Sequence, residues 1–233
     1  MAEQHDRASA ALLETVEEHG RCHGAEILES HETACEGLVG WLDYLRTSQL
    51  TDTADALLDG LHAALIESAG CLSLGLVRPA VFSMRAQIDL LLAWLFFKDH
   101  AVEWQFVEEK GQKYRLPSEV LKYLRTFYPR FESRMQLLRR RRTNGNEDPY
   151  SVLSAHVHGQ NTATVPRLGE LPLLVRERAD VDECVALQAA VSEYLSDLLV
   201  ACFAREWLDL PESVRLQCET RLSAAELEEL CRA

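Results

Sequence analysis

Apolar residues recur at helical spacing along almost the whole of this 233-residue chain. Apolar residues three and four positions apart line one face of a helix, whereas the alternation typical of strands is scarce here. Only seven prolines and eleven glycines interrupt the pattern. A hydrophobic content of 47% in a chain of this length is enough to bury a core. The sequence therefore predicts an all-α protein.

Proline and capping residues divide this pattern into segments. Pro79, Pro117 and Pro129 each fit the first turn of a helix, where the missing N–H group would have no partner. We expect one domain over residues 1–233, with an N-terminal helical extension (1–48), a core (50–208) and a C-terminal helix (211–233). The segment QNTATVPRLGELP (160–172) has no apolar period and is predicted to be an exposed loop or a loop over a site. The expected helices cover 6–47 (long or broken at glycines), 51–75, 79–99, 101–113, 117–127, 130–142, 149–158, 180–208 and 211–231.

The longest apolar run, AVFSMRAQIDLLLAWLFF (80–97), contains three polar residues, Arg85, Gln87 and Asp89. These residues make it a poor membrane span and a good central helix. Arg85 and Asp89 are one turn apart and lie on the same side of that helix. Burial of an unpaired charge costs several kcal/mol or more, so the two residues either form a structural pair or face a polar partner.

A second polar stripe is predicted in DPYSVLSAHVHG (148–159), which reads as a short helix with Asp148 as its N-cap and Gly159 at its end. Spacing of four places Tyr150, Ser154 and His158 on one face. His158 could equally cap carbonyls at the helix end or bond to Asp89. Ser154 fits a small packing residue better than a nucleophile, because no GxSxG motif surrounds it.

The charge of the chain is unevenly distributed. Residues 1–70 contain 14 acidic and 3 basic residues, whereas residues 110–142 contain 11 basic and 2 acidic ones, although the whole chain has a net charge of −13. Cations next to aromatic rings suit single-stranded nucleic acid, through phosphate neutralisation and base stacking. The alternative is an amphipathic helix with aromatics in the core and cations in solvent. The candidate RNA-binding residues are Arg139, Arg140, Arg141 and Arg142, and the interleaved aromatics are Tyr114, Tyr123, Phe127, Tyr128 and Phe131.

Seven cysteines are spread along the chain without CxxC spacing, which is typical of reduced thiols in a cytoplasmic protein. The N-terminus also lacks the basic-then-apolar order of a secretion signal. One histidine and cysteine cluster has zinc-like spacing, but its two halves would converge only if the helix broke near Gly24. We therefore expect no metal and no cofactor. The cluster consists of His19, Cys22, His23, His31 and Cys35.

The stretch ADALLDGLHAALIESAGCLSLGLVRPAVFSMRAQIDLLLAWLFF (54–97), followed by YSVLSAHVHG (150–159), resembles the HEPN superfamily. The resemblance covers roughly residues 50–205. Within the superfamily, the chain resembles the branches that carry an arginine and a carboxylate on a central helix and a serine–histidine pair on a later helix. It implies a helical bundle, often dimeric. Many members are metal-independent RNases of toxin–antitoxin, abortive-infection and CRISPR-linked defence systems, and others are binding modules.

The resemblance assigns roles to five residues. Arg85 would bind the phosphate, His158 would act as general acid and base, Asp89 would orient one of them, and Tyr150 and Ser154 would line the site. The usual nuclease signature, an arginine followed after four to six residues by a histidine, does not occur in this chain. Arg85 and His158 would have to meet through folding, and we expect them to converge with Asp89 on one site.

Two functions are therefore open. The first is a metal-independent endoribonuclease of a bacterial stress or antiviral defence system, and the second is a non-catalytic subunit that binds a partner protein or nucleic acid. In both cases we expect a cytoplasmic homodimer without a membrane segment. Single-stranded RNA and an antitoxin or defence-complex protein are the expected partners.

Overall fold

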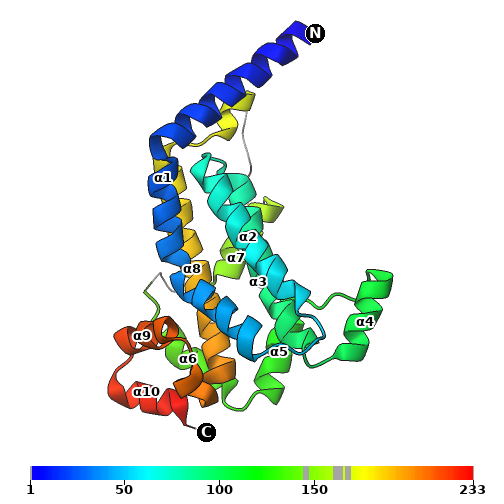
Figure 1. Cartoon of the computed structure of the whole chain (residues 1–233), viewed down its shortest axis with the longest axis vertical. Helices are drawn as coiled ribbons and strands as arrows, with labels where there is room; N and C mark the ends of the chain where they lie inside the picture. The colour runs from blue at the N-terminus through cyan, green and yellow to red at the C-terminus, as the bar shows by residue number, and fades with distance from the viewer. Residues whose placement is uncertain (1, 144–146, 160–164, 166–168, 233) are drawn as a thin grey trace. The chain divides into compact units, whose positions relative to one another are not determined.

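The computed structural model of the protein describes residues 2–143, 147–159, 165 and 169–232 (Figure 1). These residues form ten α-helices, two short 3₁₀ helices and no strand. The predicted all-α class is confirmed for them. The helices are α1 (Ala2–Ser48), α2 (Ala56–Ser73), α3 (Val77–Phe97), α4 (Ala101–Lys110), α5 (Pro117–Phe127), α6 (Phe131–Arg139), α7 (Pro149–His158), η1 (Leu171–Leu174), α8 (Arg178–Phe203), η2 (Ala204–Asp209), α9 (Glu212–Arg221) and α10 (Ala224–Cys231).

Several helix boundaries differ from the prediction. One helix was expected over 211–231, but Leu222 is extended and Ser223 begins a new helix, α10, with a capping box to Glu226. The hydroxyl of Ser223 accepts the backbone N–H of Glu226 at 3.4 Å, and the Glu226 carboxylate accepts the backbone N–H of Ser223 at 2.9 Å, which is the reciprocal pattern of a capping box. Most of the predicted loop at 160–172 lies outside the described residues, and its last two residues begin η1.

Helix α1 is unbroken, although the glycines within it were expected to be possible interruptions. In this helix the glycines allow close packing. A Cβ atom on Gly24 would lie 3.3 Å from the backbone oxygen of Ser73, and one on Gly37 would lie 2.4 Å from the side chain of Gln217. Small residues at these positions therefore bring neighbouring segments close to α1.

The chain divides into two compact units, each built from three stretches of sequence. Unit 1 comprises residues 1–35, 64–85 and 147–191, and unit 2 comprises the remaining stretches, 36–63, 86–146 and 192–233. Helices α1, α2, α3 and α8 contribute to both units. The expectation of a single domain stays a prediction.

Unit 1 contains a buried polar chain that links α1, α2 and α8. The Nε2 atom of His31 lies 2.9 Å from the hydroxyl of Ser68, and that hydroxyl donates to Gln188 at 3.1 Å. All three side chains are buried. Burial lowers the pKa of His31, because the charged imidazolium loses its hydration. Burial also lowers the pKa of His19, another buried histidine of α1.

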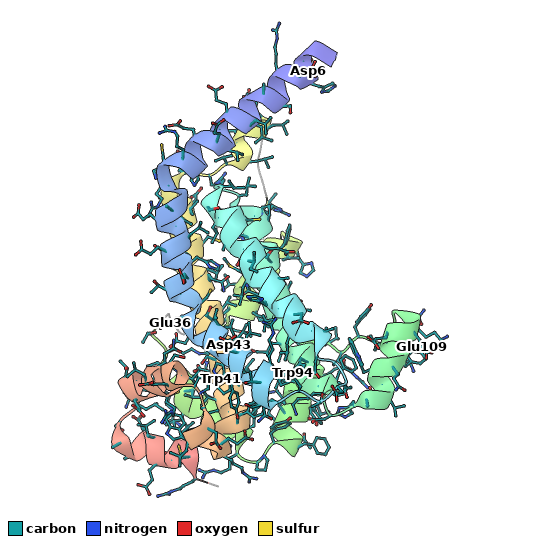
Figure 2. The ribbon with its side chains drawn as sticks, viewed as in Figure 1. Asp6, Glu36, Trp41, Asp43, Trp94 and Glu109 are labelled. Atoms are coloured by element: carbon teal, nitrogen blue, oxygen red, sulfur yellow. The ribbon has the colours of Figure 1, made fainter. Side chains whose placement is uncertain are left out.

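Unit 2 has a conventional apolar core and two buried tryptophans, Trp41 and Trp94 (Figure 2). Both indole N–H groups are satisfied. Trp41 donates to Ser196 at 3.0 Å, and Trp94 donates to Asp55 at 3.1 Å. A buried tryptophan usually needs a hydrogen-bond acceptor for its indole N–H group. The two hydrogen bonds therefore orient the rings that fill the core.

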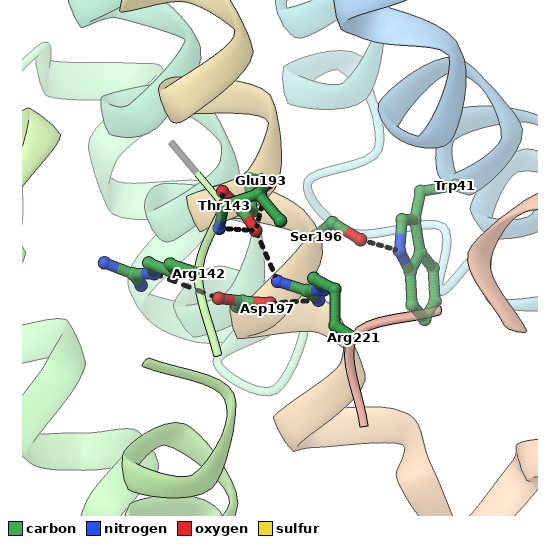
Figure 3. A network of polar contacts seen from close by, with 7 residues as sticks. All are labelled: Trp41, Arg142, Thr143, Glu193, Ser196, Asp197 and Arg221. Carbon is green, nitrogen blue, oxygen red and sulfur yellow. Dashed lines mark hydrogen bonds and ion pairs between the residues drawn. The ribbon is translucent and has the colours of Figure 1, made fainter. Parts of the chain in front are cut away.

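Four buried charges of unit 2 form one network on α8 (Figure 3). Asp197, which is fully buried, accepts from Arg142 at 3.0 Å and from Arg221 at 2.7 Å. Arg221 also pairs with Glu193 at 2.7 Å, and Glu193 accepts the backbone N–H of Thr143 at 3.0 Å. Two arginines thus balance two carboxylates, and the network ties the chain after α6 and the end of α9 to α8.

A third buried arginine in unit 2 has a different set of partners. Arg134 donates to the backbone oxygens of Leu230 at 2.9 Å, Arg232 at 3.0 Å and Ala201 at 3.3 Å. These oxygens belong to the C-terminal ends of α10 and α8, where carbonyl groups lack helical partners and the helix dipole is negative. Arg134 therefore stabilises two helix ends at once.

Two stretches, Val77–Phe97 and Leu171–Asp209, are long and apolar enough to cross a membrane by length and composition. In each, 67% of the most apolar part is buried inside the protein. Core helices of soluble proteins are equally long and apolar, so these two stretches are weak evidence for or against a membrane-spanning helix.

Replacement of Asp197 by asparagine should lower the free energy of unfolding by about 3–5 kcal/mol, because two buried guanidinium groups lose their shared counter-charge. The side chains of Arg142 and Arg221 are only 6% and 7% exposed. Urea unfolding followed by circular dichroism measures the loss. Glu228→Gln is the control, since it breaks an exposed pair with Arg232 and should cost about 1 kcal/mol or less. Equal losses in the two variants would contradict the role given to the network.

The buried histidines should make stability depend on pH. The folded pKa of His31 lies below the ordinary value of 6.5, so the unfolded chain binds the proton more readily. The contribution of His31 is therefore complete above about pH 6.5 and is lost as the pH falls from there through the folded pKa. The free energy of unfolding at pH 7.5 and pH 5.5 should differ less in His31→Gln than in the wild type. An unchanged difference would show that His31 does not titrate on unfolding.

Candidate functional site

The structure brings together one residue from each predicted polar stripe, Arg85 of α3 and Tyr150 of α7. The guanidinium carbon of Arg85 lies 3.6 Å from the centre of the Tyr150 ring. Both residues belong to unit 1 and both are half-buried. This contact is the central feature of the candidate site.

The local sequence explains the position of Tyr150. Asp148 is the N-cap of α7, and its carboxylate accepts the backbone N–H of Tyr150 at 3.3 Å and the hydroxyl of Ser151 at 3.2 Å. Buried Pro149 occupies the first helical position, where its fixed backbone angle suits a helix. The predicted N-cap and helix start are confirmed, and they hold the Tyr150 ring at the beginning of α7.

A guanidinium stacked on a ring combines attraction with orientation. Such a contact stabilises by about 0.5–2 kcal/mol, depending on how far the pair is desolvated. The guanidinium carbon of Arg85 lies over the Tyr150 ring, so the ring covers one side of the cation. Arginine is also the side chain that can bind the oxygens of a phosphate or carboxylate with two parallel N–H groups.

The other members of the α7 stripe lie further along the helix. Ser154, one turn after Tyr150, is half-buried. His158 is exposed and occupies the last turn, and Gly159 ends the helix in the left-handed conformation with φ of 57°. His158 is about 12 Å from Tyr150 along the helix axis. The predicted helix end at Gly159 is confirmed.

Asp89 is half-buried and lies one turn after Arg85 on α3. Arg85 belongs to unit 1 and Asp89 to unit 2. The convergence of these two residues with His158 on one site stays a prediction.

The run of four arginines that was predicted to bind RNA separates into different environments. Arg139 and Arg140 are exposed, whereas Arg141, also exposed, pairs with Glu226 at 2.8 Å. Arg142 is buried in the ion pair with Asp197. Its guanidinium neutralises a carboxylate inside unit 2, which is a structural role, and its assignment to RNA binding stays a prediction.

The aromatic residues of the basic segment also divide. Tyr123 and Tyr128 both donate to Asp99, at 2.9 and 2.8 Å, and Phe131 is buried. Tyr114 and Phe127 are 71% and 68% exposed. The core interpretation therefore describes Phe131, whereas Tyr123 and Tyr128 are half-buried and bound to Asp99. Tyr114 and Phe127 are the two of these five aromatics that are largely exposed.

Among the described residues, no group of three or more histidine, cysteine or acidic side chains could hold a metal ion. The zinc-like cluster was expected to form only if the helix broke near Gly24, and α1 continues through that residue. His31 instead bonds to Ser68, and Cys22 contacts Glu18 on the surface of the helix.

One feature near this site was missed by the sequence reasoning. On α3, the guanidinium carbon of Arg78 lies 5.1 Å from the centre of the Phe82 ring. The signal was present as an arginine and a phenylalanine four residues apart, a spacing that places two side chains on the same helix face.

A double-mutant cycle can measure the Arg85–Tyr150 contact. Arg85→Met and Tyr150→Leu should each destabilise the protein, with a coupling energy of about 0.5–2 kcal/mol, because each removes the same stacking contact. Tyr150→Phe is the matched control, since it keeps the ring and removes only the hydroxyl. Additive losses would mean that the stacking does not contribute to stability.

Comparison of the chain with protein-family models, with curated proteins and with solved structures finds no match. The functional interpretation therefore depends on the chemistry of the residues above, with the stacked Arg85 at their centre.

Proposed function

We propose that the chain is a HEPN-like protein of a bacterial stress or antiviral defence system that binds and cleaves single-stranded RNA without a metal ion. The contact between Arg85 and Tyr150 carries this proposal, because it joins the two helices on which the family-like polar residues occur. A preoriented arginine next to an aromatic ring suits a ligand that has both phosphates and bases.

In the proposed reaction, the 2′-hydroxyl of the RNA attacks the adjacent phosphate and the 5′-oxygen of the next nucleotide leaves. His158 takes the proton from the hydroxyl or supplies one to the leaving oxygen, a contribution of about 10²–10⁴-fold. Arg85 neutralises the charge that develops on the phosphate. Asp89 orients one of these two residues, and Tyr150 and Ser154 line the site.

The alternative is a non-catalytic subunit that uses the same helices to bind a partner protein or nucleic acid. The missing arginine–histidine spacing favours this function, as does the exposed position of His158 two turns beyond Tyr150. Arg85 would then bind its ligand without chemistry.

The proposal includes the surroundings in which the protein acts. We propose a cytoplasmic homodimer formed by helix packing, with an antitoxin or another defence protein as a further partner. The exposed Arg139 and Arg140 are proposed to add phosphate contacts at a distance from the chemistry.

Purified protein should cleave labelled single-stranded RNA in the presence of EDTA, and His158→Ala should abolish cleavage. His158 is exposed at the end of α7, so its replacement should leave the circular dichroism spectrum and the unfolding midpoint unchanged. His156→Ala is a matched control on the same helix, and it should cleave like the wild type.

The double variant Arg139→Glu/Arg140→Glu should weaken RNA binding and flatten its salt dependence without removing the cleavage chemistry. Binding without cleavage in the wild type would favour the non-catalytic function. Cleavage by His158→Ala at the wild-type rate would exclude His158 as the proton-transfer group.

A further inference from the structure

Residues 4–26 of α1 contain a single buried side chain, that of His19. We propose that His19 is an acid-sensitive anchor for the N-terminal part of this helix, residues 2–26. The neutral imidazole ring holds these residues against the rest of unit 1, and protonation of the ring releases them. The anchor is independent of the proposed RNA function, because it uses no residue of the candidate site.

Burial along α1 changes after residue 26. His19 and Gly24 are the two buried residues between positions 4 and 26, and a glycine has no side chain that could hold the helix. From Ile27, which is fully buried, buried residues recur at almost every turn. A segment with few buried contacts opens locally at a low cost in free energy. The attachment of residues 2–26 therefore depends strongly on His19.

The His19 ring packs where three segments of unit 1 meet. A Cβ atom on Gly75, in the turn between α2 and α3, would lie 3.1 Å from the Cγ and Nδ1 atoms of His19 and 2.7 Å from Cγ1 of Val175, just before α8. The backbone oxygen of Gly75 accepts the N–H of Arg176 at 2.9 Å. Gly75 has φ of 75°, so both its conformation and the space around it require glycine. A displaced His19 ring would therefore separate α1 from the turn and from the start of α8.

The surroundings of His19 favour the neutral ring. Its Nε2 atom is buried and has no hydrogen-bond partner among the described residues, so an imidazolium would carry a proton on this nitrogen without an acceptor. Burial lowers the pKa of His19, and the positive charges of His23 and Arg178 lower that pKa further. The centre of the His23 ring lies 5.2 Å from that of His19. Residues 73–75 of the turn contain no ionisable side chain.

The carboxylates near this position in the sequence of α1 and α8 do not offset those cations. Four of them are paired with arginines on the same two helices or just before α8. The pairs are Glu18 with Arg21 at 3.0 Å, Glu26 with Arg178 at 2.8 Å, Asp180 with Arg176 at 2.8 Å and Asp182 with Arg178 at 2.7 Å. Glu17 and Glu177 are exposed, so solvent screens their charges. Protonation of His19 therefore adds an unfavourable charge to a buried position.

The pH dependence of the anchor has a definite sign. The folded pKa of His19 lies below the ordinary value of 6.5, so the released segment, in which the ring is hydrated, binds the proton more readily. The attachment is complete above about pH 6.5 and weakens as the pH falls from there through the folded pKa. Because one proton is involved, the equilibrium constant for release rises by at most about tenfold per pH unit.

Hydrogen–deuterium exchange of the full chain, followed by mass spectrometry, tests the anchor. Protection factors, which correct for the pH dependence of the chemical exchange rate, are compared at pH 7.5 and pH 5.5. EDTA is present, so that no metal ion bridges His19 and His23. Protection of residues 8–26 should fall several-fold, up to about tenfold, because a released segment of this length is only a marginal helix. Residues 36–48 of the same helix should change less.

Three variants identify the titrating group. His19→Leu cannot take up a proton, so its protection at residues 8–26 should not change between the two pH values. His31→Gln removes the other buried histidine of α1 and should keep the wild-type fall. His23→Gln removes a neighbouring positive charge and raises the pKa of His19, so its fall should be smaller than that of the wild type. If His19→Leu does not fold, as judged by circular dichroism, His19→Gln replaces it.

Each result decides for or against the anchor. A fall in protection that is confined to residues 8–26 and absent from His19→Leu supports it. The anchor is overturned if the wild type shows no fall, if His19→Leu shows the same fall, or if protection is lost equally along the whole chain. Disappearance of the fall in His31→Gln would also overturn it, because the titrating group would then be His31.

Discussion

Burial of charge among apolar helices is the constraint on which the structure depends. The network around Asp197 meets it in unit 2 by giving each buried arginine a carboxylate and each carboxylate an arginine or a backbone N–H. Removal of any one member would leave a charge in a medium that solvates it poorly. The network therefore does more than add an interaction, because it specifies where the chain after α6 and the end of α9 meet α8.

The same constraint is met differently by Arg134, whose guanidinium donates to helix-end carbonyls. Those oxygens have no helical N–H to bind, so the arginine satisfies them while they satisfy the arginine. Burial lowers the pKa of Arg134, because the charged guanidinium loses its hydration. Arg134 and Arg142, which belong to the same basic stretch of sequence, thus stabilise different parts of unit 2.

At the candidate site the charge is only half-buried, and it is stacked on a ring. The contact with the ring stabilises the guanidinium by cation–π attraction. The guanidinium carbon of Arg142 lies 5.1 Å from the centre of the Tyr194 ring. Arg142 is also paired with the buried carboxylate of Asp197, which balances its charge within the protein. The burial of the side chain, more than the residue type, distinguishes Arg142 from Arg85.

Periodicity and local chemistry in the sequence determined the helical class, the N-cap at Asp148 and the end of α7 at Gly159, because these depend on residues close together in the chain. The sequence also predicted that Arg85 and Asp89 either form a structural pair or face a polar partner, but it could not name Tyr150. Only the tertiary structure decided the contact of Arg85 with Tyr150, the burial of Arg142 against Asp197, and which aromatics of the basic segment are buried, half-buried or exposed. The reason is physical: a helix period reports which side of a segment is apolar, whereas the environment of a charge is set by residues that are distant in sequence and meet only when the chain folds.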